Sequence, residues 1–286
     1  MSEVTVVGEA LVDVVARGTV SRVPGGGPMN VAVGLARLGH ATRLVTCLGE
    51  DEDGASVRAH IEANGVDLDA VPIARTSTAV ATIAADGSAS YRFDLSWLPG
   101  RIEVPASTAV LHVGSIAAVL GPGAADVREI ALRRPGDTLL TVDPNVRPTI
   151  TPDRAAVLGW LEPLLDAADV VKLSDEDAAW LYPGDPVDRV LDRILDGPTR
   201  LAAVTTGGAG CVVATPSERI ALPAAPASVV DTIGAGDSFM AGLVHALLVA
   251  GGTASSSAIG SFALACAAIT VGRHGANPPT LAEVAS

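Results

Sequence analysis

A short glycine-rich segment in the carboxyl-terminal part of the chain combines residues that could bind an anion and accept a proton. Gly234, Ala235 and Gly236 precede Asp237, and an apolar stretch of helical spacing follows. Backbone N–H groups at a helix start point toward one position, where the helix dipole adds to the attraction for negative charge. These residues therefore predict a phosphate cradle with a carboxylate in its first helical turn. For the four residues alone, a simple turn with a capping Asp fits equally well.

A second glycine-rich segment occupies residues 25–27 and also precedes a helix-like stretch. Glycines allow a ligand to approach the backbone closely. Asn30, in the first turn of the expected helix, offers both a donor and an acceptor to a hydroxyl-rich molecule. Gly26, Gly27 and Asn30 are therefore candidate ligand-binding residues.

The elements that must position these residues follow a βα rhythm. Short β-branched runs predict strands at residues 4–7, 44–47, 110–113, 139–142, 170–173 and 202–205. Longer Ala/Leu/Arg segments predict helices, for example at residues 29–38, 54–64, 153–167, 176–181 and 238–249. This alternation is typical of a mostly parallel sheet covered by helices, in which ligands bind beyond the carboxyl ends of the strands.

One segment departs from this rhythm. Residues 79–83 and 88–95 alternate in polarity around Asp86-Gly87, a dipeptide suited to a tight hairpin turn. With residues 11–17 they could form a small sheet beside the main one. The sequence has no internal repeat or low-complexity linker, so we expect one domain over residues 1–286, with a lid formed by residues 11–24 and 76–98.

The composition excludes several classes of protein. The chain has 286 residues and a net charge of −13, which disfavours binding to nucleic acid or to an anionic membrane surface. Glycines and serines divide the apolar stretch at residues 238–272 into segments too short to span a bilayer. Three widely separated cysteines suggest neither a disulfide framework nor a metal site, which fits a cytoplasmic protein. Lys172 is the only lysine and follows no glycine run, so a Walker-type phosphate loop is absent.

Together, the two glycine-rich segments resemble the signature regions of the ribokinase-like, or phosphofructokinase-B type, carbohydrate kinases. Residues 8–13 (GEALVD) are similar to the first strand of that family, and residues 143–148 and 204–210 match further family segments. The resemblance covers nearly the whole chain. It implies an α/β fold, namely a ribokinase-like three-layer α/β/α sandwich with a mostly parallel central sheet and a small β-sheet lid.

The resemblance also implies site residues. Asp237 would accept the proton of the substrate hydroxyl while the backbone amides of residues 235–237 hold the phosphate. The sugar would be bound by Asp13, Gly26, Gly27 and Asn30, and Arg92 either reaches the sugar or lies on the solvent face of the lid. The nucleotide side would include Thr205, Gly207 and Gly210. Arg147 would meet the transferring phosphate, unless Asp143 holds it in a structural ion pair.

Two cation sites are implied as well. Ser174, Glu176 and Asp177 resemble the Asn-x-x-Glu region of the family, with Ser174 in place of Asn and Asp177 in place of Glu. They would hold Mg²⁺ through water, although an acidic helix start is an alternative interpretation. Asp231 and Thr232 would contribute to a monovalent-cation site for K⁺. The five histidines lack ligand spacing and indicate no zinc site.

The implied function is an ATP-dependent sugar kinase acting on a primary hydroxyl. Fructose is the preferred substrate, because residues 8–13, 30–39 and 172–176 are similar to the fructokinase-like branch. Ribose, 2-keto-3-deoxygluconate and a nucleoside remain alternatives. Two other classes are a nicotinamide-dependent oxidoreductase, which lacks its Gly-x-Gly-x-x-Gly motif here, and a sugar-binding regulator without catalysis. The open edge of the lid predicts a homodimer.

Overall fold

The computed structural model describes residues 3–285 apart from residues 18, 84–88 and 251–253. Nine strands form the central sheet in the order β13-β12-β11-β10-β9-β8-β1-β4-β5. Seven of them are parallel, and β12 and β13 extend one edge antiparallel. All six strands expected from the β-branched runs are confirmed. The strands are β1 (Glu3–Val7), β4 (Ala41–Leu48), β5 (Asp67–Pro72), β8 (Thr108–Gly114), β9 (Leu139–Asp143), β10 (Val170–Ser174), β11 (Leu201–Thr205), β12 (Cys211–Ala214) and β13 (Arg219–Leu222).

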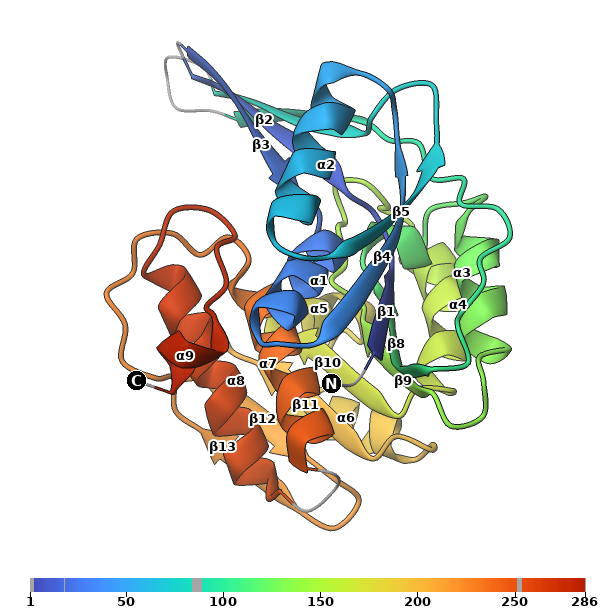
Figure 1. Cartoon of the computed structure of the whole chain (residues 1–286). Helices are drawn as coiled ribbons and strands as arrows, with labels where there is room; N and C mark the ends of the chain where they lie inside the picture. The colour runs from blue at the N-terminus through green and yellow to red at the C-terminus, as the bar shows by residue number, and fades with distance from the viewer. Residues whose placement is uncertain (1–2, 18, 84–88, 251–253, 286) are drawn as a thin grey trace.

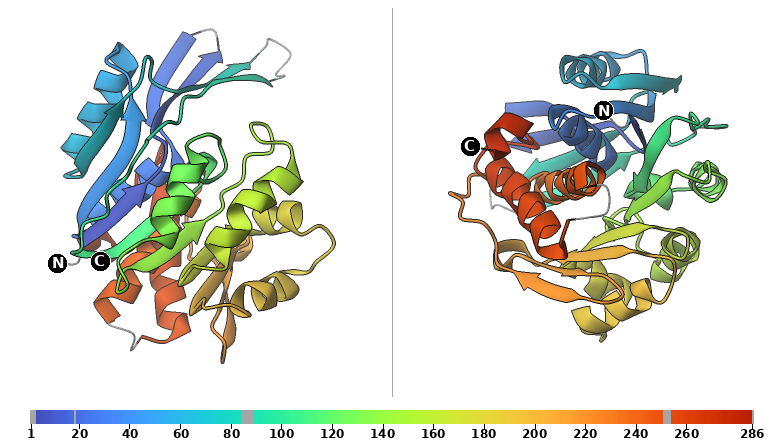
Figure 2. Two further views of the ribbon diagram at one scale, coloured as in Figure 1. Left: turned by 90° about the vertical axis from the view of Figure 1, so that its right-hand side faces the viewer. Right: turned by 60° about the horizontal axis from the view of Figure 1, so that its bottom comes forward.

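Helices cover both faces of this sheet and make three layers (Figure 1, Figure 2). One face is packed by α1 (Gly27–Arg37), α7 (Ala235–Ala250) and α8 (Ser256–Val271). The other is packed by α3 (Ala124–Leu132), α4 (Arg154–Leu165), α5 (Asp175–Leu181) and α6 (Val187–Leu195). The remaining helices are α2 (Glu52–Ala63), α9 (Leu281–Val284) and the 3₁₀ turns η1 (Ile116–Ala118) and η2 (Gly207–Ala209). The five expected helices and the sandwich fold are confirmed.

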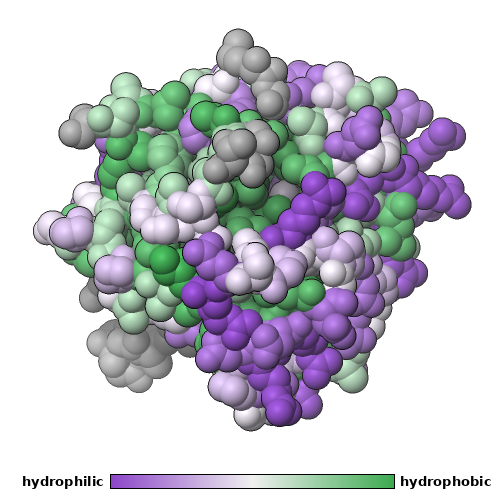
Figure 3. Space-filling model, turned by 90° about the horizontal axis from the view of Figure 1, so that it is seen from below, coloured by the Kyte–Doolittle hydropathy of each residue, from purple (hydrophilic) through white to green (hydrophobic). Residues whose placement is uncertain are grey.

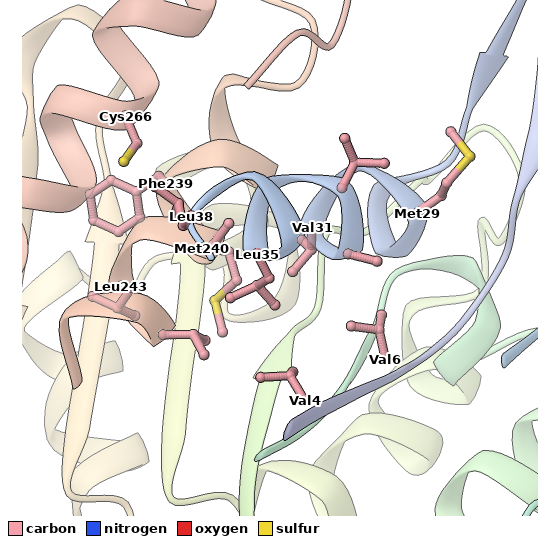
Figure 4. Close-up of a cluster of buried hydrophobic side chains, with 14 of the residues drawn as sticks. Val4, Val6, Met29, Val31, Leu35, Leu38, Phe239, Met240, Leu243 and Cys266 are labelled. Carbon is pink, nitrogen blue, oxygen red and sulfur yellow. The ribbon is translucent and has the colours of Figure 1, made fainter. Parts of the chain in front are cut away.

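The core follows the period-two alternation of a strand. On β1, Val4 and Val6 face the layer of α1 and α7, whereas Val7 belongs to the core on the opposite side. Figure 4 shows Val4 and Val6 below α1, with Met240 of α7 beside Leu35 of α1. This buried contact fixes the position of α7 relative to α1, and both helices begin at the glycine-rich segments identified in the sequence.

A smaller four-stranded sheet has the order β3-β2-β6-β7 (Figure 1). It contains β2 (Leu11–Arg17), β3 (Thr19–Gly25), β6 (Thr78–Ile83) and β7 (Ala89–Asp94). The expected antiparallel pairing of the two hairpin arms is confirmed, from Thr78 opposite Asp94 onward. The turn predicted at Asp86-Gly87 lies outside the described residues. The small sheet therefore joins two sequence segments that lie about sixty residues apart.

The lengths of the helices and the polarity of the surface can be compared with those of a membrane protein. Among the described residues, no helix has the length and apolar character needed to cross a bilayer, and α7 and α8 each have 16 residues. Seen from below, at the end away from the small sheet, the surface mixes apolar and polar residues, with hydrophilic ones gathered mainly on one side (Figure 3).

Candidate active site

The two glycine-rich segments meet at one point although they are far apart in the sequence. The side-chain amide of Asn30 donates a hydrogen bond of 2.8 Å to Oδ2 of Asp237, across 207 residues. Both side chains are buried. A narrow pocket at this point is lined by residues that include Gly27, Ser115 and Asn145. Two candidate sugar residues, Gly27 and Asn30, therefore lie beside the candidate base Asp237.

Glycine is required where the first segment approaches Asp237. A Cβ atom on Gly27 would lie 2.7 Å from Nδ2 of Asn145 and 3.3 Å from Oδ1 of Asp237. Gly26 has a φ of 117° and its backbone runs against the carbonyl of Glu9. Only glycine adopts this backbone region freely. The segment therefore brings the start of α1 close to the carboxylate, and ligand binding by this loop stays a prediction.

The second segment forms the start of α7. Gly234 has a φ of 77°, and the helix begins at Ala235, so Asp237 lies in the first turn. The N–H of Ala235 donates to the carbonyl of Thr232 at 3.3 Å. The first amides of a helix have no acceptor within that helix. Gly236 and Asp237 therefore provide the amides best placed for an anion, whereas the amide of Ala235 closes the preceding turn.

The protonation of Asp237 depends on opposing influences. Burial raises the pKa of the Asp237 carboxyl, while the hydrogen bond from Asn30 and the positive charges of Lys172 and Arg147 lower it. On balance the pKa of Asp237 is raised, chiefly by burial, and a carboxylate with a raised pKa is a stronger proton acceptor.

Asp13 lies on β2 next to the first glycine segment. A Cβ atom on Gly25 would overlap Oδ2 of Asp13, so the carboxylate sits directly over the backbone that leads into Gly26 and Gly27. Desolvation raises the pKa of Asp13. Arg92 is exposed on β7, and in the described part of the chain it forms no hydrogen bond or ion pair with these residues. Contact of Arg92 with a sugar stays a prediction.

The candidate nucleotide residues form a tight loop after β11. Thr205 ends that strand, Gly207 begins η2 and Gly210 follows it, with φ angles of 53° and 107°. The loop is closed by the amide of Thr206, which donates to the carbonyl of Gly210 at 2.8 Å. The positive φ angles favour glycine at both positions. Gly207 is exposed, whereas Gly210 is buried against the carbonyl of Leu222.

The structure contradicts one of the two roles considered for Arg147, a structural ion pair with Asp143. Its guanidinium is exposed and donates to the carbonyls of Asn145 and Val146, at 3.1 and 3.0 Å. The structural ion pair considered between Arg147 and Asp143 was wrong, because Asp143 instead binds Lys172. Arg147 thus keeps a guanidinium that reaches solvent beside the site.

The proposed magnesium residues form a helix cap. The amide of Asp177 donates to Oγ of Ser174, and the amide of Ser174 donates to Oδ2 of Asp177, each at 3.0 Å. Oδ1 of Asp177 accepts a further hydrogen bond of 2.8 Å from the amide of Val146. Glu176 is exposed. The acidic helix start is therefore present, and a role in Mg²⁺ binding stays a prediction.

The proposed monovalent-cation residues lie beside the start of α7. Asp231 accepts hydrogen bonds from the amides of Ile233 and Gly275, at 3.0 and 2.9 Å, and these bonds lower its pKa. Thr232 is exposed. Among the residues that the structure describes, no group of three or more His, Cys, Asp or Glu side chains is arranged to hold a metal ion.

Sequence reasoning missed two kinds of residue. Lys172 was set aside because no phosphate loop contains it, yet its ammonium is buried beside Asp143. The sequence did contain a signal for this pair. Lys172 lies inside an apolar strand, and the preceding strand ends in Asp143. Ser115 and Asn145 line the pocket with φ angles of 52° and 40°, which are strained for residues other than glycine. No sequence pattern indicated this strain.

Comparison with known proteins identifies the chain's relatives. The model of the pfkB family of carbohydrate kinases matches residues 1–283. Fructokinase-1 of Oryza sativa subsp. japonica is 34% identical over 283 residues, covering 92% of this chain and 87% of that protein. A fructokinase of Rhizobium leguminosarum bv. trifolii is 29% identical over 254 residues, covering 84% and 78%. The family match leaves no support for a nicotinamide-dependent oxidoreductase.

Solved structures agree with this assignment. A fructokinase double mutant from Vibrio cholerae O395, bound to fructose, ADP and a potassium ion, superposes with a TM-score of 0.87 at 28% identity, covering 100% of this chain and 97% of that one. A fructokinase from Xylella fastidiosa with bound ATP gives a TM-score of 0.82 at 26% identity, covering 99% and 97%.

Proposed function

Because the chain belongs to the pfkB family of carbohydrate kinases, we propose that it transfers the γ-phosphate of ATP to a primary hydroxyl of fructose. Kinase activity follows from the family. The choice of fructose is supported by the fructokinases among its relatives and by the fructose-bound structural neighbour. Ribose, 2-keto-3-deoxygluconate and nucleosides are the competing acceptors.

The observation that carries the proposal is the position of Asp237. Its carboxylate is held by Asn30 in the first turn of α7, directly beside the amides that we expect to bind the phosphate. The sugar hydroxyl would give its proton to Asp237, and its oxygen would form a bond to the γ-phosphorus. The bond from that phosphorus to the bridging oxygen breaks, and ADP leaves with the electron pair. Such a reaction depends mainly on positioning and on stabilising charge.

The remaining groups bind the two substrates. Asp13, Gly26, Gly27 and Asn30 would bind the sugar, with Arg92 added if the small sheet closes as a lid. Thr205, Gly207 and Gly210 would bind the nucleotide, and the exposed guanidinium of Arg147 would bind the transferring phosphate. Guanidinium groups pair well with phosphate oxygens.

The metal requirement is proposed in two parts. We expect Mg²⁺ to arrive with ATP and to neutralise charge on its phosphates. Ser174, Glu176 and Asp177 would meet this ion only through water, because both carboxylate oxygens of Asp177 already accept backbone hydrogen bonds. Asp231 and Thr232 would support a K⁺ site beside the anion cradle.

We also propose a cytoplasmic location and a homodimer formed through the small sheet. The sheet ends in the edge strands β3 and β7. Its exposed apolar side chains include Val20, Val23 and Tyr91, which are 65%, 50% and 61% exposed. Open strand edges with apolar side chains favour pairing with a second copy. Size-exclusion chromatography with light scattering should show a dimer at micromolar concentration, and a monomer would contradict this assembly.

The decisive test is ADP release from Mg-ATP with fructose, ribose, 2-keto-3-deoxygluconate, glucose and adenosine, each with and without K⁺. Fructose should support the fastest turnover. Asp237→Asn keeps the shape of the side chain but removes its basicity, so turnover should fall by about 10²–10⁴-fold. Asp196→Asn, on an exposed residue after α6, serves as the matched control and should retain full activity.

The outcomes separate the alternatives. Turnover with another acceptor, lost in Asp237→Asn, would keep the kinase mechanism and replace fructose. ATP binding without turnover for any acceptor would favour the sugar-binding regulator. Retention of most activity by Asp237→Asn would refute the role of Asp237 as the base.

A further inference from the structure

The only lysine of the chain lies buried in the sheet beneath the anion cradle. Nζ of Lys172, on β10, is 3.0 Å from Oδ2 of Asp143 at the end of β9. Both side chains are 4% exposed. Burial alone would lower the pKa of Lys172, but the carboxylates of Asp143 and Asp177 raise it above its usual value. Lys172 is therefore a permanently charged group inside the protein.

Lys172 also contacts the cradle itself. A Cβ atom on Gly236 would lie 3.0 Å from Nζ of Lys172, so the ammonium lies directly against the backbone of the second cradle glycine. The same ammonium interacts electrostatically with Asp237. One cation thus touches the backbone that faces the phosphate and acts on the carboxylate that accepts the proton.

The charge balance around the site shows why this cation matters. Asp143 on β9, Asp177 on α5 and Asp237 on α7 all interact with Lys172. His112 on β8 also faces the ammonium, and its pKa is lowered to about 3 by burial and by Lys172, so it adds no charge. Arg147 is the other cation that acts on Asp237, and it is exposed. Without Lys172, an incoming triphosphate would meet three carboxylates with no buried positive charge.

The ion pair is poorly explained by stability alone. Buried ion pairs contribute little to stability compared with apolar residues of similar size, because both charges lose their hydration. Among the described residues, Oδ1 of Asp143 is also a buried side-chain oxygen without a hydrogen-bond partner. A pair kept only for folding would be expected to satisfy both carboxylate oxygens. Asp143 and Asp237 instead line the same pocket.

We propose that Lys172 is a positioning residue for phosphoryl transfer, whose buried ammonium holds the cradle at Gly236 and offsets the negative charge that builds up between Asp237 and the phosphate. The proposal rests on the kinase function proposed above. Lys172 does not touch the substrates; it acts through the backbone of Gly236 and the carboxylate of Asp237. Fixed positive charge near a developing negative charge stabilises the transition state more than the ground state.

The first test replaces the charge while keeping the shape. Lys172→Met should lower kcat by about 10²–10³-fold and change KM for the sugar by less than about threefold, because the loss falls on the transition state. The single variant leaves Asp143 buried and unpaired, which can destabilise the fold. Lys172→Met/Asp143→Asn removes both charges and should recover thermal stability without recovering kcat.

A control ion pair lies in the loops before β9 and β10. Arg134 and Asp169 form a part-buried pair of 3.2 Å at the opposite end of β10, away from the site. Arg134→Met/Asp169→Asn should lower the melting temperature and leave kcat unchanged. Recovery of kcat by the Lys172→Met/Asp143→Asn variant to within about threefold of wild type would show that the lysine pair is purely structural. Full kcat in folded Lys172→Met would also overturn the proposal.

A second measurement needs no variant. Because Lys172 is the only lysine, ¹³C-lysine labelling of an enzyme without lysine in its tag gives one side-chain signal in a two-dimensional NMR spectrum. This signal should shift when ADP, fructose and aluminium fluoride form a mimic of the transferring phosphate, and shift less with ADP alone. An unchanged signal would refute the proposal. If wild-type enzyme phosphorylates none of the tested acceptors, the proposed function fails separately.

Discussion

The buried acid Glu9 allows a quantitative test of the site's electrostatics. Glu9 follows β1 and is 7% exposed, and its Oε2 accepts a hydrogen bond of 3.0 Å from the amide of Ala117. Burial raises the pKa of Glu9 from 4.5 to about 7, and this outweighs the hydrogen bonds from Ser115 and Ala117. The native protein therefore holds the Glu9 proton more strongly than the unfolded chain.

The sign and size of the effect follow from linkage. Because the folded pKa is raised, the stabilisation from protonated Glu9 is fully present below the unfolded value of 4.5 and is lost as the pH rises through about 7. The pKa difference corresponds to roughly 3 kcal/mol in the free energy of unfolding, most of it lost between about pH 5 and 8. Glu9→Gln cannot titrate, and its amide oxygen can still accept from Ala117.

Urea denaturation of wild type and Glu9→Gln at several pH values measures this directly. The wild type should lose about 2–3 kcal/mol relative to the variant between about pH 5 and 8, since other groups titrate in both proteins and cancel. A difference that stays constant within about 0.5 kcal/mol across that range would refute the argument that burial controls the pKa of Glu9.

Two further substitutions probe neighbouring parts of the site. Gly27→Ala places a methyl group between Asn145 and Asp237, so kcat/KM for the sugar should fall by about 10²-fold in steady-state assays, and an unchanged value would contradict the close approach. Asp177→Ala removes the acceptors of the Ser174 and Val146 amides and with them half of the capping box of α5, so urea denaturation should show a loss of about 2–4 kcal/mol. Glu176→Ala, on an exposed neighbour, should have little effect on stability, and equal losses in both variants would argue against the cap.

The sequence predicted the fold because its signals are local. β-Branched runs and helical spacing identify strands and helices, and the sheet of parallel strands follows from their alternation. The site was predictable only where a motif carries its own geometry, as at residues 234–237. The contact between Asn30 and Asp237 depends on how α1 and α7 pack, which no spacing encodes.

Side-chain pairing was the part that sequence reasoning could not resolve. Arg147 was the partner considered for Asp143, whereas Asp143 binds Lys172 because β9 lies beside β10. Ser174 and Asp177 likewise fitted both a metal site and a helix cap, and the cap became visible only with the backbone of α5 in place. Which side chains pair depends on the spatial distance between elements that lie far apart in the sequence.

The separation between Asn30 and Asp237 also has a consequence for synthesis on the ribosome. Most of the residues proposed to bind the sugar are translated early, whereas the proposed cradle and base at the start of α7 appear about two hundred residues later. A partly translated chain would therefore contain most of the proposed sugar-binding groups without the proposed base. With Asp237 in that role, a chain that ends before α7 would lack kinase activity.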